Sequence, residues 1–147
     1  MREREDGRLI VRRRFRATPE ELFAEWTDAA SMGDWMCPGD VVATEVQLDL
    51  RVGGALRIVM RDARRSFEHR GVFTLIDRPN KLAFTWIADA TDQQRTLVTV
   101  EFIPVSSRET ELVLTHTDFP RKSSRDQYQS GWSGILDRLE QHRLEKS

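Results

Sequence analysis

Apolar and polar residues alternate along most of the chain, which is the pattern of strands that bury one face. The first such segment runs from Leu9 to Ala17, where Leu9, Val11 and Phe15 share one face. Arginines occupy most of the other face. The segment therefore predicts a strand with one side toward water.

The pattern changes to helical spacing in "ATPEELFAEWTD". Thr18 is a good N-cap, Pro19 suits the first helical position, and Glu21 completes a capping box. A short helix is expected here. The following "TDAASMGDWMCPGD" predicts a second short helical turn that runs into a loop.

From Val41 to Thr117 the sequence predicts strands and turns throughout. The tight turns are supplied by "RVGG", whose glycines permit positive φ, and by "DRPN". The six expected strands are Val41 to Leu50, Ala55 to Arg61, Phe67 to Ile76, "KLAFTWI", Thr96 to Ile103 and Glu111 to Thr117. Short connections between successive strands predict an antiparallel meander.

The C-terminal "DQYQSGWSGILDRLEQHRLEK" predicts a long amphipathic helix, with Ser124 and Gln127 as its capping box. One apolar stripe is expected to face the sheet. That stripe consists of Tyr128, Trp132, Ile135, Leu136 and Leu139. With the strands before it, this helix predicts an α+β domain.

Two glycines, Gly131 and Gly134, stand in the first half of this helix. Each costs about 0.5 to 1 kcal/mol relative to alanine in a helix interior, so a close approach to the backbone is expected. Gly131 falls at the edge of the apolar stripe and Gly134 further round, toward solvent. We therefore expect Gly131 to leave space or to permit close packing of the short helices.

The length and the net charge of the chain limit the number of domains and the classes of partner that it can have. The 147 residues and 17.1 kDa fit one domain, residues 1–147, and a net charge of -1 provides no field for nucleic acid or an anionic membrane. We expect neither a signal peptide nor a membrane span. A single cysteine, Cys37, excludes an internal disulfide, and a cytoplasmic location is the default expectation.

Five segments together resemble a known family: "FRATPEELFAEWTDAASMGDW", "DLRVGG", "RPNKLAFTW", "LVLTHTDF" and "GWSGILDRLEQHRL". From about Leu9 to Leu144 the chain is similar to single-domain bacterial proteins related to the C-terminal domain of the activator of heat shock protein 90 ATPase. These belong to the START-like, or SRPBCC, superfamily. The matching positions are Trp26, Trp35, Gly53, Gly54, Gly71, Phe84, Trp86, His116, Gly131 and Trp132.

The resemblance implies a helix-grip fold, in which a curved antiparallel sheet wraps the C-terminal helix and two short helices close one end. It also implies a cavity between helix and sheet that would bind a small, largely apolar molecule. The residues expected to line it are Trp35, Met36, Ile58, Met60, Phe84, Trp86, Val100, Phe102, Leu114, His116, Tyr128, Gly131 and Trp132. Trp35 and Met36, in a loop, would line its entrance.

His116 shares strand parity with Leu112 and Leu114 and is expected to point inward. It is either a polar group at the cavity mouth, oriented by Asp118, or a hydrogen-bonded core histidine. The first reading allows an enzyme of the cyclase or aromatase kind, with His116 as acid or base. Binding without catalysis is the expectation that the sequence favours.

Other chemistry has little support. His69 and His142 have no visible partners, and the absence of HxxxH or CxxC spacing argues against a metal or cofactor. The sequence shows no base for Cys37, and no GxSxG, P-loop or GxGxxG is present. The arginines around Arg61 to Arg70 predict a solvated surface rather than an RNA site.

Two kinds of protein partner stay open. The resemblance implies a chaperone co-factor of the heat shock protein 90 type. A sheet edge or the tryptophan-bearing loop could also make a homodimer.

Overall fold

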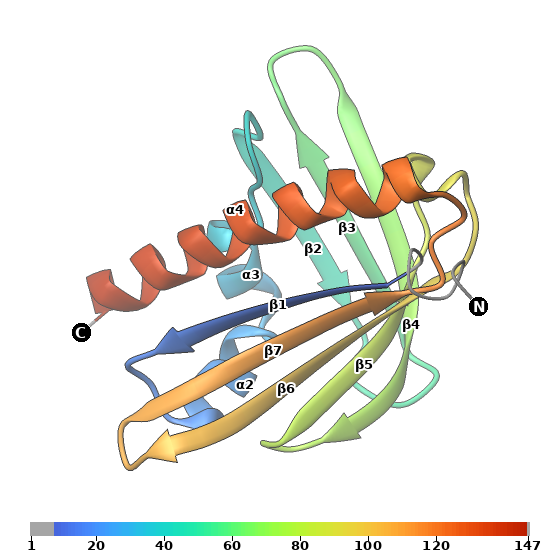
Figure 1. Ribbon diagram of the computed structural model, residues 1–147. Coiled ribbons are helices and arrows are strands. Elements are labelled where there is room, and N and C mark those ends of the chain that lie inside the picture. The colour runs from blue at the N-terminus through green and yellow to red at the C-terminus, as the bar shows by residue number, and fades with distance from the viewer. Residues whose placement is uncertain (1–7, 147) are drawn as a thin grey trace.

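The computed structural model describes residues 8–146 (Figure 1). Seven strands form one antiparallel sheet in the order β1-β7-β6-β5-β4-β3-β2. The elements are β1 Arg8–Phe15, α2 Pro19–Glu25, α3 Ala29–Trp35, β2 Ala43–Leu48, β3 Ala55–Arg61, β4 Ser66–Asp77, β5 Lys81–Trp86, the 3-10 turn η1 Asp89–Thr91, β6 Thr96–Ser106, β7 Glu109–Thr117 and α4 Lys122–Lys146. The expected α+β helix-grip fold is confirmed.

The sheet is a meander of six strands, and the first strand of the chain adds to it at one edge. From β2 to β7 each strand pairs with the next, and β1 returns to pair with β7. The long α4 crosses the curved sheet obliquely (Figure 1). Helix α2 packs against β6, while α3 packs against both β2 and α4. The two short helices therefore join the sheet to the C-terminal half of the long helix.

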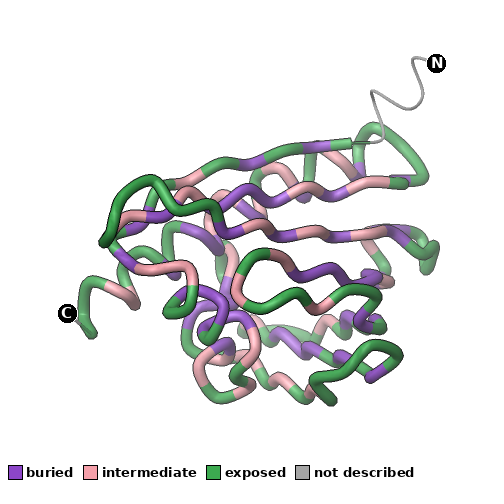
Figure 2. The backbone as a smooth tube through the Cα atoms, turned by 90° about the horizontal axis from the view of Figure 1, so that it is seen from below, coloured by how far each residue is buried: buried purple, intermediate pink, exposed green. Residues whose placement is uncertain are grey.

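The predicted alternation is visible in the burial of the strands (Figure 2). In β3, Leu56, Ile58 and Met60 are buried, whereas Arg57 and Arg61 are exposed. The inward side chains of the sheet meet those of all three α-helices in a single hydrophobic core. Burial of this core is the main favourable contribution to folding.

Strand β4 serves two parts of the sheet. Its first half pairs with β3 and its second half with β5, with a register shift between Phe73 and Leu75. At the bend lies Gly71, where an added Cβ would stand 1.8 Å from the carbonyl oxygen of Thr85. Only glycine allows the backbones to approach so closely. In the "RVGG" turn, Gly53 has the expected positive φ, +87°.

Capping boxes were predicted at the starts of two helices, α2 and α4, and only the first of them is present. The capping box at the start of α2 is confirmed, because Thr18 and Glu21 bond each other's backbone N–H. The capping box at Ser124 is wrong. Helix α4 begins at Lys122, so Ser124 lies within the first turn with its side chain buried in the core.

The two glycines of α4 differ in what an added Cβ would meet. An added Cβ at Gly131 would meet nothing within 4 Å, which fits a glycine that leaves space and excludes one that permits close packing. A Cβ at Gly134 would lie 3.9 Å from the backbone nitrogen of Gly39 and 4.0 Å from Cα of Pro38. Gly134 is partly exposed and borders the loop after α3.

Candidate functional site

A continuous layer of aromatic rings lies under α4. Trp35 of α3 contacts Trp26, which follows α2, with ring centroids 4.8 Å apart. Trp26 then stands 6.3 Å from Trp132 of α4, and Trp132 stands 5.2 Å from Trp86 of β5. All four indoles are almost fully buried. Aromatic side chains thus fill the space where the resemblance implied a cavity.

His116 of β7 is the polar centre of this layer. Trp132 donates its indole N–H to Nδ1 of His116 over 3.0 Å, and Nε2 lies 2.7 Å from Oγ1 of Thr96. Indole nitrogen is only a donor, so Nδ1 accepts and the ring proton sits on Nε2. The Thr96 hydroxyl, 2.6 Å from the carbonyl oxygen of Trp86, donates onward to it. A directed series of hydrogen bonds therefore joins α4 to three strands.

The surroundings keep His116 neutral. Burial lowers the pKa of His116 from 6.5 to about 3, because a charged ring would lose its hydration there. Asp118 does not orient it, since that residue is exposed and both ring nitrogens are engaged elsewhere. Of the two readings of this residue, the geometry matches the hydrogen-bonded core histidine. A neutral imidazole with both nitrogens occupied is poorly placed for acid or base catalysis.

The aromatic layer reaches the surface at the N-terminal end of α4. His69, Phe119 and Tyr128 are each 8 to 9% exposed, and they surround Trp86 and His116. Tyr128 accepts a hydrogen bond from the indole of Trp86 over 3.0 Å. Burial raises the pKa of Tyr128 to about 12 and lowers that of His69. Both side chains are therefore uncharged near neutral pH.

Most residues expected to line the cavity do converge on this region. Twelve of them belong to the single hydrophobic core or its polar centre: Trp35, Met36, Ile58, Met60, Phe84, Trp86, Val100, Phe102, Leu114, His116, Tyr128 and Trp132. Gly131 lies outside it, partly exposed. Trp35 and Met36 are fully buried at the end of α3, so they do not form an entrance at the surface.

Two indole N–H groups in this layer have no acceptor among residues 8–146. They belong to Trp26 and Trp35, which are 1% and 0% exposed. A buried donor left without a partner costs about 1 to 3 kcal/mol, and such groups are uncommon in native proteins. These two donors are thus the uncompensated polar atoms of the aromatic layer.

A buried carboxylate, Glu25, ties the end of α2 to the end of α4. Its oxygens lie 3.1 Å from Nε2 of His142, 2.8 Å from Arg143 and 3.3 Å from Lys146, and the Ser31 hydroxyl donates to it. Burial acts to raise the pKa of Glu25, but these donors and positive charges outweigh it and leave the pKa below its ordinary value. This cluster was not predicted from the sequence, in which His142 has no visible partner.

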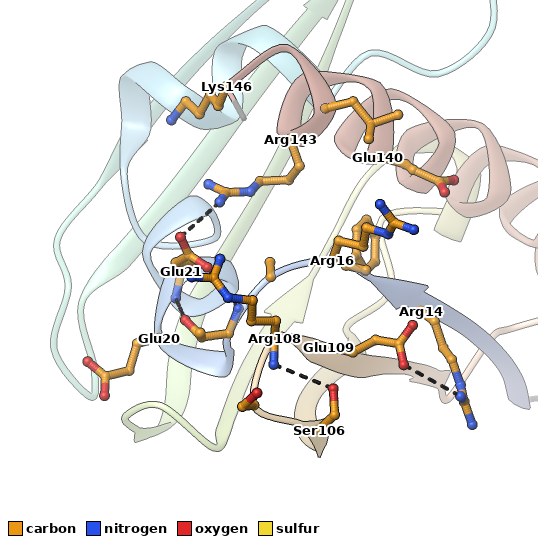
Figure 3. Close-up of a pocket in the computed structure, with 15 residues that line it drawn as sticks. Arg14, Arg16, Glu20, Glu21, Ser106, Arg108, Glu109, Glu140, Arg143 and Lys146 are labelled. Carbon is orange, nitrogen blue, oxygen red and sulfur yellow. Dashed lines mark hydrogen bonds and ion pairs between the residues drawn. The ribbon is translucent and has the colours of Figure 1, made fainter.

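A groove of about 1410 Å³ lies on the surface beside this cluster (Figure 3). Its walls come from the end of β1, the start of α2, the β6–β7 turn and the C-terminal end of α4. The labelled side chains are mostly charged, and they include Arg16, Arg108 and Arg143 (Figure 3). None of the residues expected to bind a ligand lines this groove, which the sequence did not predict.

The remaining candidates have structural surroundings. Cys37 is buried, and its sulfur lies 3.3 Å from the Thr44 hydroxyl and 3.7 Å from the Gly33 carbonyl oxygen. In the described part of the chain, no three His, Cys, Asp or Glu residues gather as metal ligands would. Over the same residues, no helix combines the length and apolar character needed to cross a membrane.

Comparison with known proteins places this fold in a family. The model of the family described as activator of Hsp90 ATPase homolog 1-like protein matches residues 16–143. No curated protein matches the chain.

Solved structures of the same type are similar over nearly the whole length. A Rhodobacter sphaeroides protein is 26% identical, with 95% of this chain and 94% of that chain covered and a TM-score of 0.82. An HSP90 activator from Plasmodium falciparum is also 26% identical, with 91% and 94% covered and a TM-score of 0.73. The AHSA1 protein from Silicibacter pomeroyi, 24% identical with 96% and 100% covered and a TM-score of 0.81, shares the fold.

Proposed function

The chain belongs to the family of activator of Hsp90 ATPase homolog 1-like proteins, and from this premise we propose that it binds a small, largely apolar molecule between α4 and the sheet. The support is the aromatic layer under α4, which offers rings for stacking and almost no charge. Sites for small molecules are mostly apolar with a few placed polar groups.

The observation that carries the proposal is the pair of buried indole N–H groups on Trp26 and Trp35. Both are donors without an acceptor in residues 8–146, and their rings lie 4.8 Å apart. A ligand oxygen that accepts from either one would recover the free energy lost by burying the donor. The preferred ligand is therefore an apolar molecule with a carbonyl or ether oxygen.

Entry of such a molecule requires aromatic side chains to move, because the layer is closely packed. The rim formed by His69, Phe119 and Tyr128 is where the layer reaches solvent, so we place the entrance there. Rotation of Tyr128 would break only its hydrogen bond with Trp86 and leave the His116 hydrogen bonds in place.

The test begins with native mass spectrometry of the protein purified from its own host, followed by extraction of anything retained. A reproducible apolar adduct supports the proposal. Uptake is then measured with the fluorescent probe 1-anilinonaphthalene-8-sulfonate and with the extracted molecule. Trp26→Phe with Trp35→Phe removes both free donors while it keeps aromatic rings in place, and affinity is expected to fall about tenfold.

Phe23→Leu is the matched control, since Phe23 is buried in the same core but brings no polar atom. It reduces packing without removing a donor and should change affinity much less. Equal losses in the two variants would contradict a role for the indole donors. A clean mass from the host together with no uptake of 1-anilinonaphthalene-8-sulfonate by the wild-type protein would contradict ligand binding altogether.

A second candidate function is that of a chaperone co-factor. Its support is the 26% identity to the Plasmodium falciparum HSP90 activator over nearly the whole chain. The test is the ATPase rate of the host's own heat shock protein 90 with increasing amounts of this protein. Unchanged ATPase activity at saturating protein would remove this candidate and leave the ligand-binding proposal untouched.

A further inference from the structure

Two arginines of the surface groove are unused by the fold. Arg16 follows β1 and Arg108 stands in the turn between β6 and β7, so they approach the groove from different elements. Both are exposed. Neither guanidinium forms an ion pair or a side-chain hydrogen bond within residues 8–146. In Figure 3 the Arg16 side chain extends toward α4 and that of Arg108 toward α2.

The acidic residues around the groove are largely occupied by other cations. Glu109 lies 3.8 Å from Arg14, and Glu140 lies 3.6 Å from Arg13. Glu21 lies 3.2 Å from Arg143. Glu20 makes no such pair within the described residues, but its side chain points away from the hollow (Figure 3). The charge left over inside the groove is therefore the positive charge of the two arginines.

We propose that this groove binds an acidic, extended segment of a partner protein, with Arg16 and Arg108 each holding one carboxylate. A planar guanidinium recognises a carboxylate through two parallel hydrogen bonds, and such charge-assisted bonds are stronger than neutral ones. This groove is separate from the aromatic layer, so the test of peptide binding does not depend on whether a ligand binds under α4.

The size and lining of the groove favour a peptide over a small anion. A volume of about 1410 Å³ exceeds the roughly 300 to 1,000 Å³ of ordinary small-molecule pockets. The arginines come from separate walls, which suits carboxylates spaced along a chain. Ser106 and Ser107, both exposed in the lining, offer hydroxyl groups for hydrogen bonds to a peptide backbone.

The binding test uses the whole protein and a short fluorescein-labelled peptide of alternating glutamate and serine, followed by fluorescence anisotropy. A peptide with glutamine in place of glutamate is the ligand control. Arg16→Gln with Arg108→Gln removes the two free charges. Arg64→Gln with Arg95→Gln removes the same charge from two exposed arginines that do not line the groove.

The proposal predicts that the glutamate peptide binds the wild-type protein and that the groove double variant binds it at least about tenfold more weakly. The control double variant should retain affinity within about twofold, and raised salt should weaken binding. All four substitutions are at exposed positions, so thermal unfolding should show every variant folded.

Three results would overturn the proposal. The first is no binding of the glutamate peptide by the wild-type protein. The second is an equal loss in the groove and control variants, which would mean that only net charge matters. The third is binding of inorganic phosphate or citrate that depends on the two arginines, with no binding of the peptide, since that would assign the groove to a small anion.

Discussion

His116 should make this protein lose stability in mild acid, by an amount that can be estimated. Its pKa is about 3 in the folded protein against an ordinary value of 6.5. Between these values the unfolded chain binds a proton at this residue and the folded protein does not. Stability from this residue is therefore complete above about pH 6.5 and is lost as the pH falls toward about 3.

One pKa unit corresponds to about 1.36 kcal/mol. At about pH 5 the neutral His116 therefore costs about 2 kcal/mol of the free energy of unfolding relative to its value above pH 6.5. Other groups, including His69, whose pKa is also lowered, contribute to the total pH dependence. A variant in which residue 116 cannot titrate separates the contribution of His116 to this pH dependence from that of the other groups.

His116→Gln is that variant, because its side-chain amide can still donate to Thr96 but does not titrate. Urea unfolding of both proteins gives the free energy of unfolding at about pH 7.5 and about pH 5. The difference in free energy of unfolding, wild type minus variant, is expected to be about 2 kcal/mol smaller at about pH 5 than at about pH 7.5.

An unchanged difference between the two proteins at the two pH values would refute the argument that His116 is buried and neutral. The ring nitrogens of the wild-type protein provide a check that does not depend on the variant folding. Their NMR shifts should report a neutral ring, with the proton on Nε2, down to about pH 4.

The remaining predictions concern single side chains. Glu25→Gln should lower the free energy of unfolding by about 2 to 3 kcal/mol near neutral pH, because the partly buried Arg143 loses its buried charge partner and keeps only the exposed Glu21. Since the pKa of Glu25 lies below 4.5 in the folded protein, this advantage of the wild type should disappear as the pH falls through that lowered pKa, and an advantage that persists there would contradict the assignment. Gly131→Ala should raise stability by about 0.5 to 1 kcal/mol, since its Cβ meets nothing within 4 Å in a helix, and a loss in thermal unfolding would show a contact that the structure lacks. Gly71→Ala, the opposite case, should destabilise by about 3 kcal/mol or more because its Cβ would collide with the Thr85 carbonyl, and a neutral effect would mean that β4 and β5 can separate at the bend.

Local patterns were enough to predict the strands and the start of the first helix. Alternation in "ALRIVMR" matches β3, Ala55–Arg61, at both ends. The residues that cap α2 are three positions apart, so their bonding depends on nothing distant. The error at Ser124 arose because a capping pattern describes local geometry, whereas the actual helix begins at Lys122 and places Ser124 among the buried residues.

The candidate site was predicted only as far as strand parity extends. Parity placed His116 in the core, but its partners Thr96 and Trp132 are 20 and 16 residues away in sequence. Glu25 carried no signal at all, since its partners on α4 lie 117 to 121 residues further on. The groove likewise forms only when the β6–β7 turn is brought beside the start of α2.

The hydrogen bonds through His116 make one hydrogen atom a natural spectroscopic reporter. The proton on Nε2 points at Thr96 and is enclosed by the sheet and by buried rings, so its exchange with solvent should be slow. Any molecule that wedges α4 away from β7 must first part Trp132 from His116. The lifetime and chemical shift of that single ring proton would then record how often, and how far, the helix lifts from the sheet, without any label.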